Sequence, residues 1–367
     1  MTPENKGILL KLLGQYRELG ISEQIDYDKF YLYSIIVHST AIEGSTVTEV
    51  EAQLLFDEGI TSSKRTMQEQ QMNLDLKVAY EYGREWIKQH SPITVDWLIL
   101  LASKVMARTG SEYSAIGGNF SAAKGELRKL NVSAGIGGKS YMSYLKVPER
   151  LAAFCDELNR RRSELRAKLA SAMTSLVGGR QDVNRRRKAI NPTDVCAIYD
   201  LSFWAHYELV TIHPWADGNG RTSRLLMNLL QWEFGVLPTK VLTEDKATYI
   251  QALIDTREKE DIAIFQNCMA TLHAEHLRTD IDQYVNTTVD TTQKKGKTTQ
   301  KTLSTTQKAI LDYLKEHPLA TRQEVAEALG DITEDGIKYH FSRLQKNGYL
   351  KREGGRKLGH WIITATV

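Results

Sequence analysis

A long polar stretch near the C-terminal end sets the main limit on how this chain can fold. Residues 287–305 read TTVDTTQKKGKTTQKTLST and hold almost no apolar side chains. Such a segment cannot bury enough apolar surface to offset the entropy lost on ordering, so we expect a linker, placed at residues 286–303. The 367 residues have room for two or three domains. We expect a helical region at 1–110, a core at 111–285 and a C-terminal module at 304–367.

The first 110 residues carry the apolar spacing of helices. Apolar side chains recur at helical intervals from Phe30 to Ile42, and Gly44 then supplies a stop. A second amphipathic segment precedes Pro92, and residues 94–109 form a third. The sequence therefore predicts an N-terminal helical region.

Helical spacing stops in the glycine-rich segment that follows. Two short runs, Leu127–Val132 and Ser140–Leu145, flank the last glycines and predict a β-hairpin. Helix resumes at Pro148, and another helix runs from about Thr193 to Ile212. It ends at His213, because a residue that precedes proline is pushed out of the helical region. We predict an all-α fold interrupted by one hairpin.

Charge and cysteine content limit the class of protein. The net charge of +3 is too small to require a polyanionic partner, and the basic run at 185–188 is expected to be a solvated surface loop. Cys155, Cys196 and Cys268 lie far apart without a CxxC pair, which is typical of free thiols in a reducing compartment. We find no secretory signal at the N-terminus and no run of the ~20 apolar residues that a membrane helix needs. We expect a cytoplasmic protein with no membrane partner.

The segment TIHPWADGNGRTSRLL, residues 211–226, combines the residue types of phosphoryl or nucleotidyl transfer. Its glycines allow the backbone to approach a ligand closely, and the loop runs into a helix N-terminus that favours anions. Arg221 and Arg224 stand in the first helical turn, and their forked donors suit phosphate oxygens. Asp217 offers the carboxylate that Mg²⁺ takes beside phosphates, and His213 can accept a proton near neutral pH. The Walker motif GxxxxGK[ST] is absent from the sequence.

This segment resembles the signature of the Fic family, HPFx[D/N]GNGRxxR. The chain matches the signature from His213 to Arg224, with Trp215 where the family usually has phenylalanine. That position packs into the core in the family, so we expect the larger aromatic ring to be tolerated. The resemblance covers about residues 1–285 and implies an all-helical core with a short β-hairpin flap. It also implies transfer of AMP from ATP to a Ser, Thr or Tyr hydroxyl of a target protein.

The resemblance implies a role for each residue of the segment. His213 would be the general base, Asp217 the Mg²⁺ ligand, and Arg221 the group that holds the inner phosphates. Arg224 would hold the γ-phosphate. The residues expected to bind ATP are Asp217, Gly218, Asn219, Gly220, Arg221, Thr222, Ser223, Arg224 and Tyr249, of which Gly218, Asn219 and Gly220 form the anion-binding loop.

Two further parts of the expected site lie outside the signature. Tyr249 stands where family members have an aromatic residue near the adenine, and an ordinary place on an amphipathic helix is an equally good interpretation. Ile250 and Arg257 replace residues that are often tyrosine and asparagine in the family. The hairpin near residues 126–144 resembles the family's flap, which docks the target chain by strand addition.

The stretch HSTAIEGS, residues 38–45, resembles the family's inhibitory motif [S/T]xxxE[G/N] through Ser39, Glu43 and Gly44. In such proteins the glutamate pairs with the second arginine of the signature, here Arg224. The resemblance implies that a carboxylate competes with the γ-phosphate for one guanidinium. The alternative is a surface glutamate in the last turn of a helix capped by Gly44. The position upstream of the core indicates the type of Fic protein with an N-terminal inhibitory helix.

Residues 304–367 resemble a winged helix. TRQEVAEALG and TEDGIKYHFSRLQKNG have helix-turn-helix spacing, and YLKREGGRKLGHWIITA resembles the wing, with Gly354-Gly355 at its tip. Basic residues lie on the expected recognition helix and along the wing: Lys338, Arg343, Lys346, Lys351, Arg352, Arg356 and Lys357. Contact with a DNA backbone and contact with a protein both fit this pattern.

Three functions fit the sequence. The first is a self-inhibited protein adenylyltransferase, which the intact histidine favours because a mere sensor has no need of a base. The second is a winged-helix transcriptional regulator whose Fic core senses a nucleotide. The third is a metal hydrolase built on HAEH, in which His273 and His276 can share a helix face. No further metal ligands are evident in the sequence, and surface histidines are the plainer interpretation.

Several properties stay open in the sequence. It does not identify the target protein, and the chain itself is one candidate. It does not fix the transferred group, since some relatives move UMP, phosphocholine or phosphate, or say whether the chain also removes AMP. Dimers are common among relatives, and a homodimer is left open here.

Overall fold

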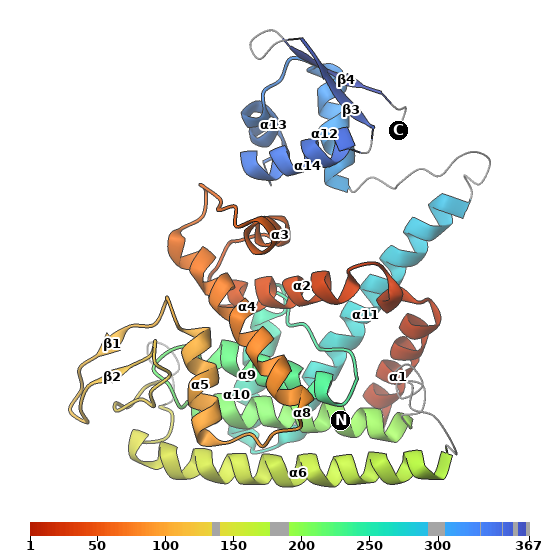
Figure 1. The fold of residues 1–367 in the computed structure, drawn as a ribbon. Coiled ribbons are helices and arrows are strands. Elements are labelled where there is room, and N and C mark those ends of the chain that lie inside the picture. Colours follow the sequence, from red (N-terminus) through yellow and green to blue (C-terminus); the bar gives the residue numbers. More distant parts are fainter. Residues whose placement is uncertain are drawn as a thin grey trace. The chain divides into compact units, whose positions relative to one another are not determined.

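The computed structural model describes residues 1–133, 140–176, 191–292, 305–330, 332–346, 348–354 and 359–364. The two sheets of this part are antiparallel pairs, β1 with β2 and β3 with β4. The described chain is therefore mainly helical, as the sequence predicts. Its elements, drawn in Figure 1, are α1 (Pro3–Glu18), η1 (Ile21–Glu23), α2 (Tyr27–Ala41), α3 (Glu49–Glu58), α4 (Met67–Lys88), α5 (Val95–Val105), β1 (Glu112–Tyr113), β2 (Phe120–Ser121), η2 (Tyr144–Lys146), α6 (Val147–Leu176), α8 (Pro192–Ile212), α9 (Asn219–Glu233), α10 (Lys246–Lys259), α11 (Ile262–Thr292), α12 (Thr305–Glu316), α13 (Arg322–Leu329), α14 (Glu334–Lys346), β3 (Leu350–Glu353) and β4 (His360–Ile363).

The chain divides into two compact units. The first consists of Met1–Ser45 and Gln71–Asn286, and the second of Thr46–Gln70 and Thr287–Val367. Helices α1 and α2 therefore belong to the same unit as the signature. Helix α11 continues beyond the expected start of the linker, while residues 293–304 and the basic run at 185–188 lie outside the described part of the chain. The domain boundaries expected from the sequence stay a prediction.

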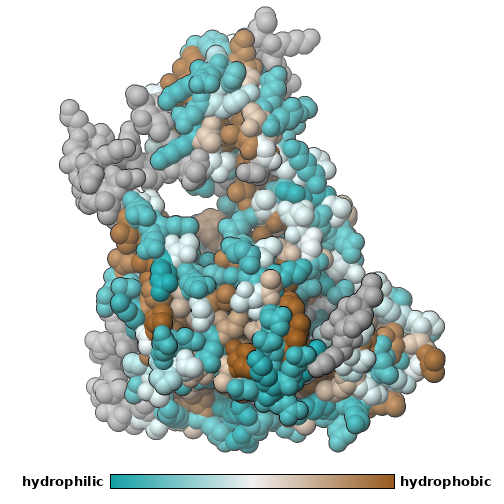
Figure 2. Space-filling model, turned by 180° about the vertical axis from the view of Figure 1, so that it is seen from behind, coloured by the Kyte–Doolittle hydropathy of each residue, from teal (hydrophilic) through white to brown (hydrophobic). Residues whose placement is uncertain are grey.

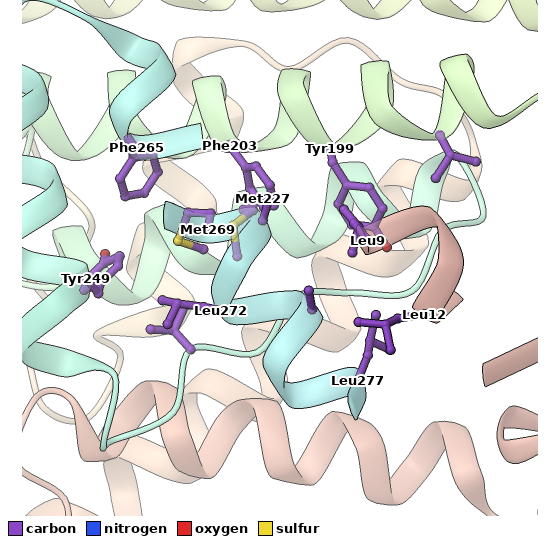
Figure 3. Packing of buried hydrophobic residues seen from close by; sticks show 14 of the residues in the cluster. Leu9, Leu12, Tyr199, Phe203, Met227, Tyr249, Phe265, Met269, Leu272 and Leu277 are labelled. Carbon is purple, nitrogen blue, oxygen red and sulfur yellow. The ribbon is translucent and has the colours of Figure 1, made fainter. Parts of the chain in front are cut away.

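Helices α8 and α9 form the centre of the first unit. The signature turn joins them, and α6 lies along α8 (Figure 1). Apolar side chains from α1, α8, α9, α10 and α11 meet in one buried cluster that includes Leu12, Tyr199, Met227, Tyr249 and Phe265 (Figure 3). Burying one such side chain typically contributes about 1.5–3 kcal/mol, so this cluster holds the helices that carry the signature.

Local sequence defines the two helix ends that meet at the signature. Helix α8 ends at Ile212, and His213 adopts a left-handed backbone with a φ of 52°. Pro214 cannot continue the helix, so the chain must turn. Helix α9 then starts at Asn219 after Gly218, whose φ of 81° lies in the left-handed region that favours glycine.

The glycine-rich segment differs from the expected hairpin. β1 and β2 form a short antiparallel pair that the sequence patterns do not predict, because strands of two residues show no alternation. In the expected flap, Ser133 and Ser140 make an antiparallel bridge, and residues 134–139 lie outside the described part of the chain. The Arg128 amide donates to the Pro214 carbonyl at 2.9 Å, so part of the first expected strand bonds to the signature turn instead of a neighbouring strand.

The C-terminal helices and strands form a winged helix, as the sequence predicts. Helices α12, α13 and α14 share a buried core with the two strands, and Phe341 and Trp361 pack edge to face within it. Strands β3 and β4 are antiparallel, with Leu350 opposite Ile363. Gly354 follows β3 with a φ of 94°, a turn conformation that favours glycine.

The surface mixes polar and apolar side chains. On the face drawn in Figure 2, hydrophilic residues cover much of the surface, and apolar residues are scattered among them. Exposed apolar side chains include Ile25, Ile116 and Leu319. Single residues of this kind are normal on a folded protein. Among the described helices, none has the length and apolar content needed to cross a membrane.

A buried ion pair joins α6 to α9. Arg162 donates from Nε and Nη2 to the two carboxylate oxygens of Glu233, each at 2.9 Å, and both side chains are fully buried. Two parallel bonds are a strong arrangement for an arginine and a carboxylate. Removing Arg162 leaves the buried Glu233 carboxylate with only its contacts to His90 at 3.2 Å and Arg166 at 3.5 Å, both to Oε1, and Oε2 loses its partner. Leaving a buried charge incompletely paired costs more than the pair itself contributes.

We predict that Arg162→Ala lowers the free energy of unfolding by about 3–5 kcal/mol. Arg160→Ala is the matched control, because Arg160 lies on the same helix and pairs at the surface with Glu157 and Glu164. We expect the control to lose less than about 1 kcal/mol. Urea unfolding followed by circular dichroism measures both, and equal losses would contradict the prediction.

Candidate active site

His213 lies at the turn between α8 and α9 with one ring nitrogen already bonded. Its Nδ1 is 3.1 Å from the Val210 carbonyl oxygen. A carbonyl can only accept, so Nδ1 carries the proton and Nε2 keeps a lone pair. His213 therefore has the tautomer that a general base needs.

Burial keeps the His213 ring neutral. Desolvation is the largest cause of a pKa lowered to about 4; the bond to Val210 opposes it, and the charge of Arg128 adds to it. The carboxylates of Glu43 and Asp217 raise this pKa by smaller amounts. At pH 7 the imidazole is therefore uncharged and able to take a proton.

The N-terminus of α9 presents bare backbone. Gly218 precedes the helix and brings no side chain to cap the first amides. A Cβ at Gly218 would lie 2.8 Å from the Met106 sulfur, so packing requires glycine here. An uncapped helix N-terminus has free N–H donors and the positive end of the helix dipole. An anion such as a phosphate is therefore favoured at this end of α9.

Arg221, in the first turn of α9, is buried and only partly hydrogen-bonded. Its side chain is 2% exposed, and Nη2 reaches Asp217 Oδ1 at 3.3 Å. Its Nε and Nη1 have no hydrogen-bond partner among the described residues. Buried donors left unpaired cost free energy, so an anion that filled them would be bound favourably. The Asp217 side chain is 54% exposed and can reach a further partner.

The guanidinium of Arg224 is held by the segment at the end of α2. Nε donates to the Ser39 hydroxyl and Nη2 to the Ser39 carbonyl, both at 2.9 Å. Nη2 also donates to Glu43 Oε1 at 2.6 Å. The Arg224 side chain is 3% exposed and the Glu43 side chain 32%, so water screens this pair in part from the Glu43 side. The structure thus brings together the three residues that the resemblance relates.

The Glu43 carboxylate is ionised and lies against the glycine loop. Burial acts to raise the pKa of Glu43, but the charge and hydrogen bond of Arg224 outweigh it, and the pKa lies below its usual range. A Cβ at Gly220 would lie 2.5 Å from Glu43 Oε1 and 3.0 Å from Arg224 Nη1. The carboxylate therefore sits directly against the Gly220 backbone. Gly44 follows with a φ of 101°, which favours glycine.

Tyr249 lies in the core and not on an open surface. It is 1% exposed, and its ring lies among apolar side chains (Figure 3). Its hydroxyl is 2.8 Å from His206 Nε2 and is also bonded to Arg224. Burial, followed by the charge of Arg224, lowers the pKa of His206 to about 3, so the hydrogen bond to Tyr249 is made by a neutral ring. This position favours a packed residue that supports Arg224, and contact with adenine stays a prediction.

Three other residues expected to bind ATP have buried side chains. Asn219 closes the turn: Oδ1 accepts from the Trp215 amide at 3.1 Å, and Nδ2 donates to the Trp215 carbonyl at 2.9 Å. The side chains of Thr222 and Ser223 are wholly buried. Asn219 therefore supports the turn from inside, and the other two side chains are packed away from solvent.

Sequence patterns do not indicate Arg128, which the structure places in the site. It is 1% exposed and donates from Nε to the His213 carbonyl at 2.7 Å. Nη1 donates to the Leu130 carbonyl and Nη2 to the Met142 carbonyl, at 2.8 and 2.6 Å. Arg128 therefore ties both sides of the flap region to the backbone of His213. One arginine in an expected hairpin carries no spacing signal that would identify it.

The two histidines of HAEH are buried, which corrects the expectation of surface histidines. His273 lies 3.1 Å from the Tyr199 hydroxyl, and His276 Nε2 lies 2.8 Å from Asp245 Oδ2. Residues three apart share a helix face, and here that face is turned to the core. No group of three or more potential metal ligands occurs in the described part of the chain. The hydrolase hypothesis gains no further ligand from the structure.

Known proteins match two parts of this chain. Residues 182–231 match the Fic/DOC family, and residues 303–351 match the winged helix-turn-helix DNA-binding family. Protein adenylyltransferase fic-1 of Caenorhabditis briggsae is 25% identical over 228 residues, which are 62% of this chain and 36% of the relative. Protein adenylyltransferase Fic of Drosophila willistoni is 25% identical over 226 residues, 59% of this chain and 35% of the relative. The chain thus spans about a third of the length of these curated relatives.

Solved structures share the fold. A Fic-domain-containing signalling protein of Bacteroides thetaiotaomicron superposes with a TM-score of 0.55 and 19% identity, covering 76% of this chain and 97% of that one. A Fic family protein of Desulfovibrio desulfuricans gives a TM-score of 0.55 and 17% identity, covering 100% of this chain and 98% of that one. The solved structures thus support the mainly helical fold in which the turn, the glycine loop and the two arginines lie. The chain carries a segment that matches the Fic/DOC family at residues 182–231, followed by one that matches the winged helix-turn-helix DNA-binding family at residues 303–351.

Trp215, the one departure from the signature, is anchored to the flap region. Its ring is 1% exposed, and the indole N–H donates to the Gly125 carbonyl at 2.9 Å. We predict that Trp215→Phe lowers the free energy of unfolding by about 1–3 kcal/mol, because it leaves a buried carbonyl unpaired. Trp204→Phe, a partly buried control on α8, should lose less. Urea unfolding measures both, and an unchanged midpoint for Trp215→Phe would refute the role of this bond.

Proposed function

We propose that this chain is a protein adenylyltransferase, which transfers AMP from ATP to a Ser, Thr or Tyr hydroxyl of a protein. One arrangement carries the proposal: neutral His213 with a lone pair on Nε2, on the same turn as the buried and incompletely bonded Arg221. A base next to an anion site suits transfer of a phosphate-bearing group. The relatives named protein adenylyltransferase in nematodes and flies support the same activity.

In the proposed reaction, the acceptor hydroxyl attacks the α-phosphorus of ATP. His213 Nε2 takes the hydroxyl proton as the new oxygen–phosphorus bond forms. The bond between the α-phosphorus and the bridging oxygen breaks, and pyrophosphate leaves with that electron pair. Arg221 and the first amides of α9 offset the negative charge of the phosphates. With a pKa of about 4, His213 is protonated, and the reaction thereby slowed, only in acid.

Asp217 fits the role of magnesium ligand. Its carboxylate is about half exposed beside the anion site. Magnesium usually takes one or two carboxylates together with substrate phosphate oxygens and water, so one carboxylate is enough. When bound, the ion would neutralise phosphate charge, and Asp217 would hold it against the loop.

We further propose that Glu43 inhibits the transfer. The Glu43 carboxylate bonds the guanidinium that would hold the γ-phosphate, and it does so against the Gly220 backbone. Two anions cannot share these donors and this space. ATP therefore reaches a productive pose only when Glu43 leaves Arg224.

We predict that Glu43→Gly raises AMP transfer onto the chain or a target by about tenfold or more, the factor that corresponds to removing about 1.4 kcal/mol of competing interaction. Intact mass after incubation with ATP and Mg²⁺ measures the transfer. Glu18→Gly is the matched control, because Glu18 is an exposed glutamate at the end of α1. Equal labelling of Glu43→Gly and wild type would exclude the inhibitory role.

We predict that His213→Ala, made in the Glu43→Gly background, lowers the rate of transfer by about 10²–10⁴-fold, the usual contribution of a positioned base. Nucleotide binding measured by calorimetry should change little, because the phosphate donors remain. Transfer at an undiminished rate would show that His213 is not the base.

The same mass measurement also identifies the transferred group. Incubating Glu43→Gly with each nucleoside triphosphate separates AMP from UMP or another group by mass. The chain itself is one candidate target, and a homodimer is one candidate assembly. The three free cysteines, Cys155, Cys196 and Cys268, support a cytoplasmic location, where thiols stay reduced.

A second candidate function is DNA binding by the winged helix, with the Fic domain as a nucleotide sensor. The match to a DNA-binding winged helix-turn-helix family favours it. Lys338 and Arg343 are exposed on α14, and Lys351 and Arg352 on β3. Lys346 ends α14, while Arg356 and Lys357 lie outside the described part of the chain.

We predict that duplex DNA binds in a gel shift and that affinity falls at least about tenfold between roughly 50 and 200 mM salt, as counterion release requires. The double variant Lys338→Ala/Arg343→Ala should weaken binding. Lys308→Ala is the control, because Lys308 is an exposed lysine on α12. No shift at low salt would instead indicate a winged helix that contacts protein.

A further inference from the structure

The ring of Tyr141 lies flat against the imidazole of His213. The two ring centroids are 3.8 Å apart, and the ring planes differ by 19°. Tyr141 comes from the flap region, where its amide donates to the Val132 carbonyl at 3.0 Å. The mechanism proposed above makes no use of this ring.

The stack constrains the imidazole without covering its reactive nitrogen. The bond from Nδ1 to the Val210 carbonyl lies in the ring plane and fixes how the ring is turned. Tyr141 lies on one face and fixes how the ring is tilted. The lone pair of Nε2 points outward in the ring plane, away from a stacked neighbour. His213 is therefore oriented by two contacts while Nε2 stays available.

Tyr141 brings bulk but no charge to this face. Burial raises the pKa of Tyr141, and the charge of Arg257 opposes this effect, so the phenol is neutral at pH 7. The Arg257 guanidinium carbon is 5.9 Å from the centroid of the Tyr141 ring. A neutral ring in face-to-face contact removes water from the imidazole, and desolvation disfavours the protonated form of a histidine.

We propose that Tyr141 is a positioning residue for the general base: its stacked ring orients the His213 imidazole and screens one face from water. The inference rests on the proposed function, because it assigns a role within the same site. The flap region would then have a second role beside docking the target chain. Arg128 holds the backbone of His213, and Tyr141 holds its side chain.

Other charged groups also act on His213 and must stay constant in a test. Arg128 lowers its pKa, while Glu43 and Asp217 raise it. A substitution at Tyr141 removes none of these charges. A change in the titration of His213 in such a variant therefore reports the loss of the ring.

The test is an NMR titration of His213 in the full-length chain. Histidines carry ¹³C at Cε1, and His213→Gln assigns the signal. In Tyr141→Leu we expect the pKa of His213 to rise from about 4 by about one pH unit or more, towards its ordinary value. Tyr141→Phe keeps the stack and should leave this pKa unchanged. Tyr144→Leu is the matched control, a tyrosine three residues along the same segment, and should also leave it unchanged.

An unchanged His213 pKa in Tyr141→Leu would overturn the proposal. So would an equal rise in Tyr141→Phe, since the hydroxyl and not the ring would then be responsible. The wild type gives an answer even when Tyr141→Leu does not fold. The ring current of a stacked tyrosine should move the Cε1 proton of His213 upfield of the position of a random-coil histidine, and an ordinary position would contradict the stack.

Kinetics separate this proposal from the proposed function. In the Glu43→Gly background, Tyr141→Leu should lower kcat about tenfold or more with little change in KM for ATP, because base alignment is lost. The loss of kcat at acidic pH should begin at a higher pH in this variant. Tyr141→Phe should retain the kcat of the Glu43→Gly parent. An unchanged kcat would refute the positioning role. AMP transfer absent from every variant, with the NMR shift intact, would refute the proposed function and leave the contact with His213 standing.

Discussion

The contact between Glu43 and Arg224 links the N-terminal helices to the signature turn. Arg224 is buried in the second turn of α9, and a buried guanidinium needs a partner anion. The end of α2 supplies that anion together with the hydroxyl and carbonyl of Ser39. Met1–Ser45 therefore packs as part of the same unit as the site, although nearly 170 residues separate Glu43 from the signature.

The proposed base, His213, depends on a different part of the chain. His213 stands where α8 must end, because Pro214 stops the helix, and its backbone is left-handed. Arg128 secures that strained residue through its carbonyl, and Val210 fixes which ring nitrogen carries the proton. The proposed base and the proposed anion site are thus held by separate neighbours on one turn. A change on one side can leave the other in place.

Sequence reasoning predicted the parts of the site that are close together in the chain. The signature and the motif at Ser39 and Glu43 could be identified, because fixed spacing on a turn or helix end carries the information. Arg128 and Tyr141 could not, since they reach His213 across the fold from a segment without periodicity. Tyr249 was ambiguous because helical spacing does not say whether a tyrosine faces ligand or core. The long helices were predicted from their apolar spacing, whereas β1 and β2 are too short to show alternation.

The absence of a side chain at Gly220 has a thermodynamic consequence. The Glu43 oxygen lies where a Cβ would clash, so glycine makes room for the internal carboxylate and, under the proposed function, for an external phosphate in the same space. Under the proposed inhibition the two occupants would be linked as competing ligands, and only the fraction of molecules with Glu43 withdrawn would use nucleotide productively. Each additional 1.4 kcal/mol or so in favour of the internal pair raises about tenfold the ATP concentration needed for half-occupancy. The concentration of ATP in the cell, and any partner that binds α2, would then shift the same equilibrium.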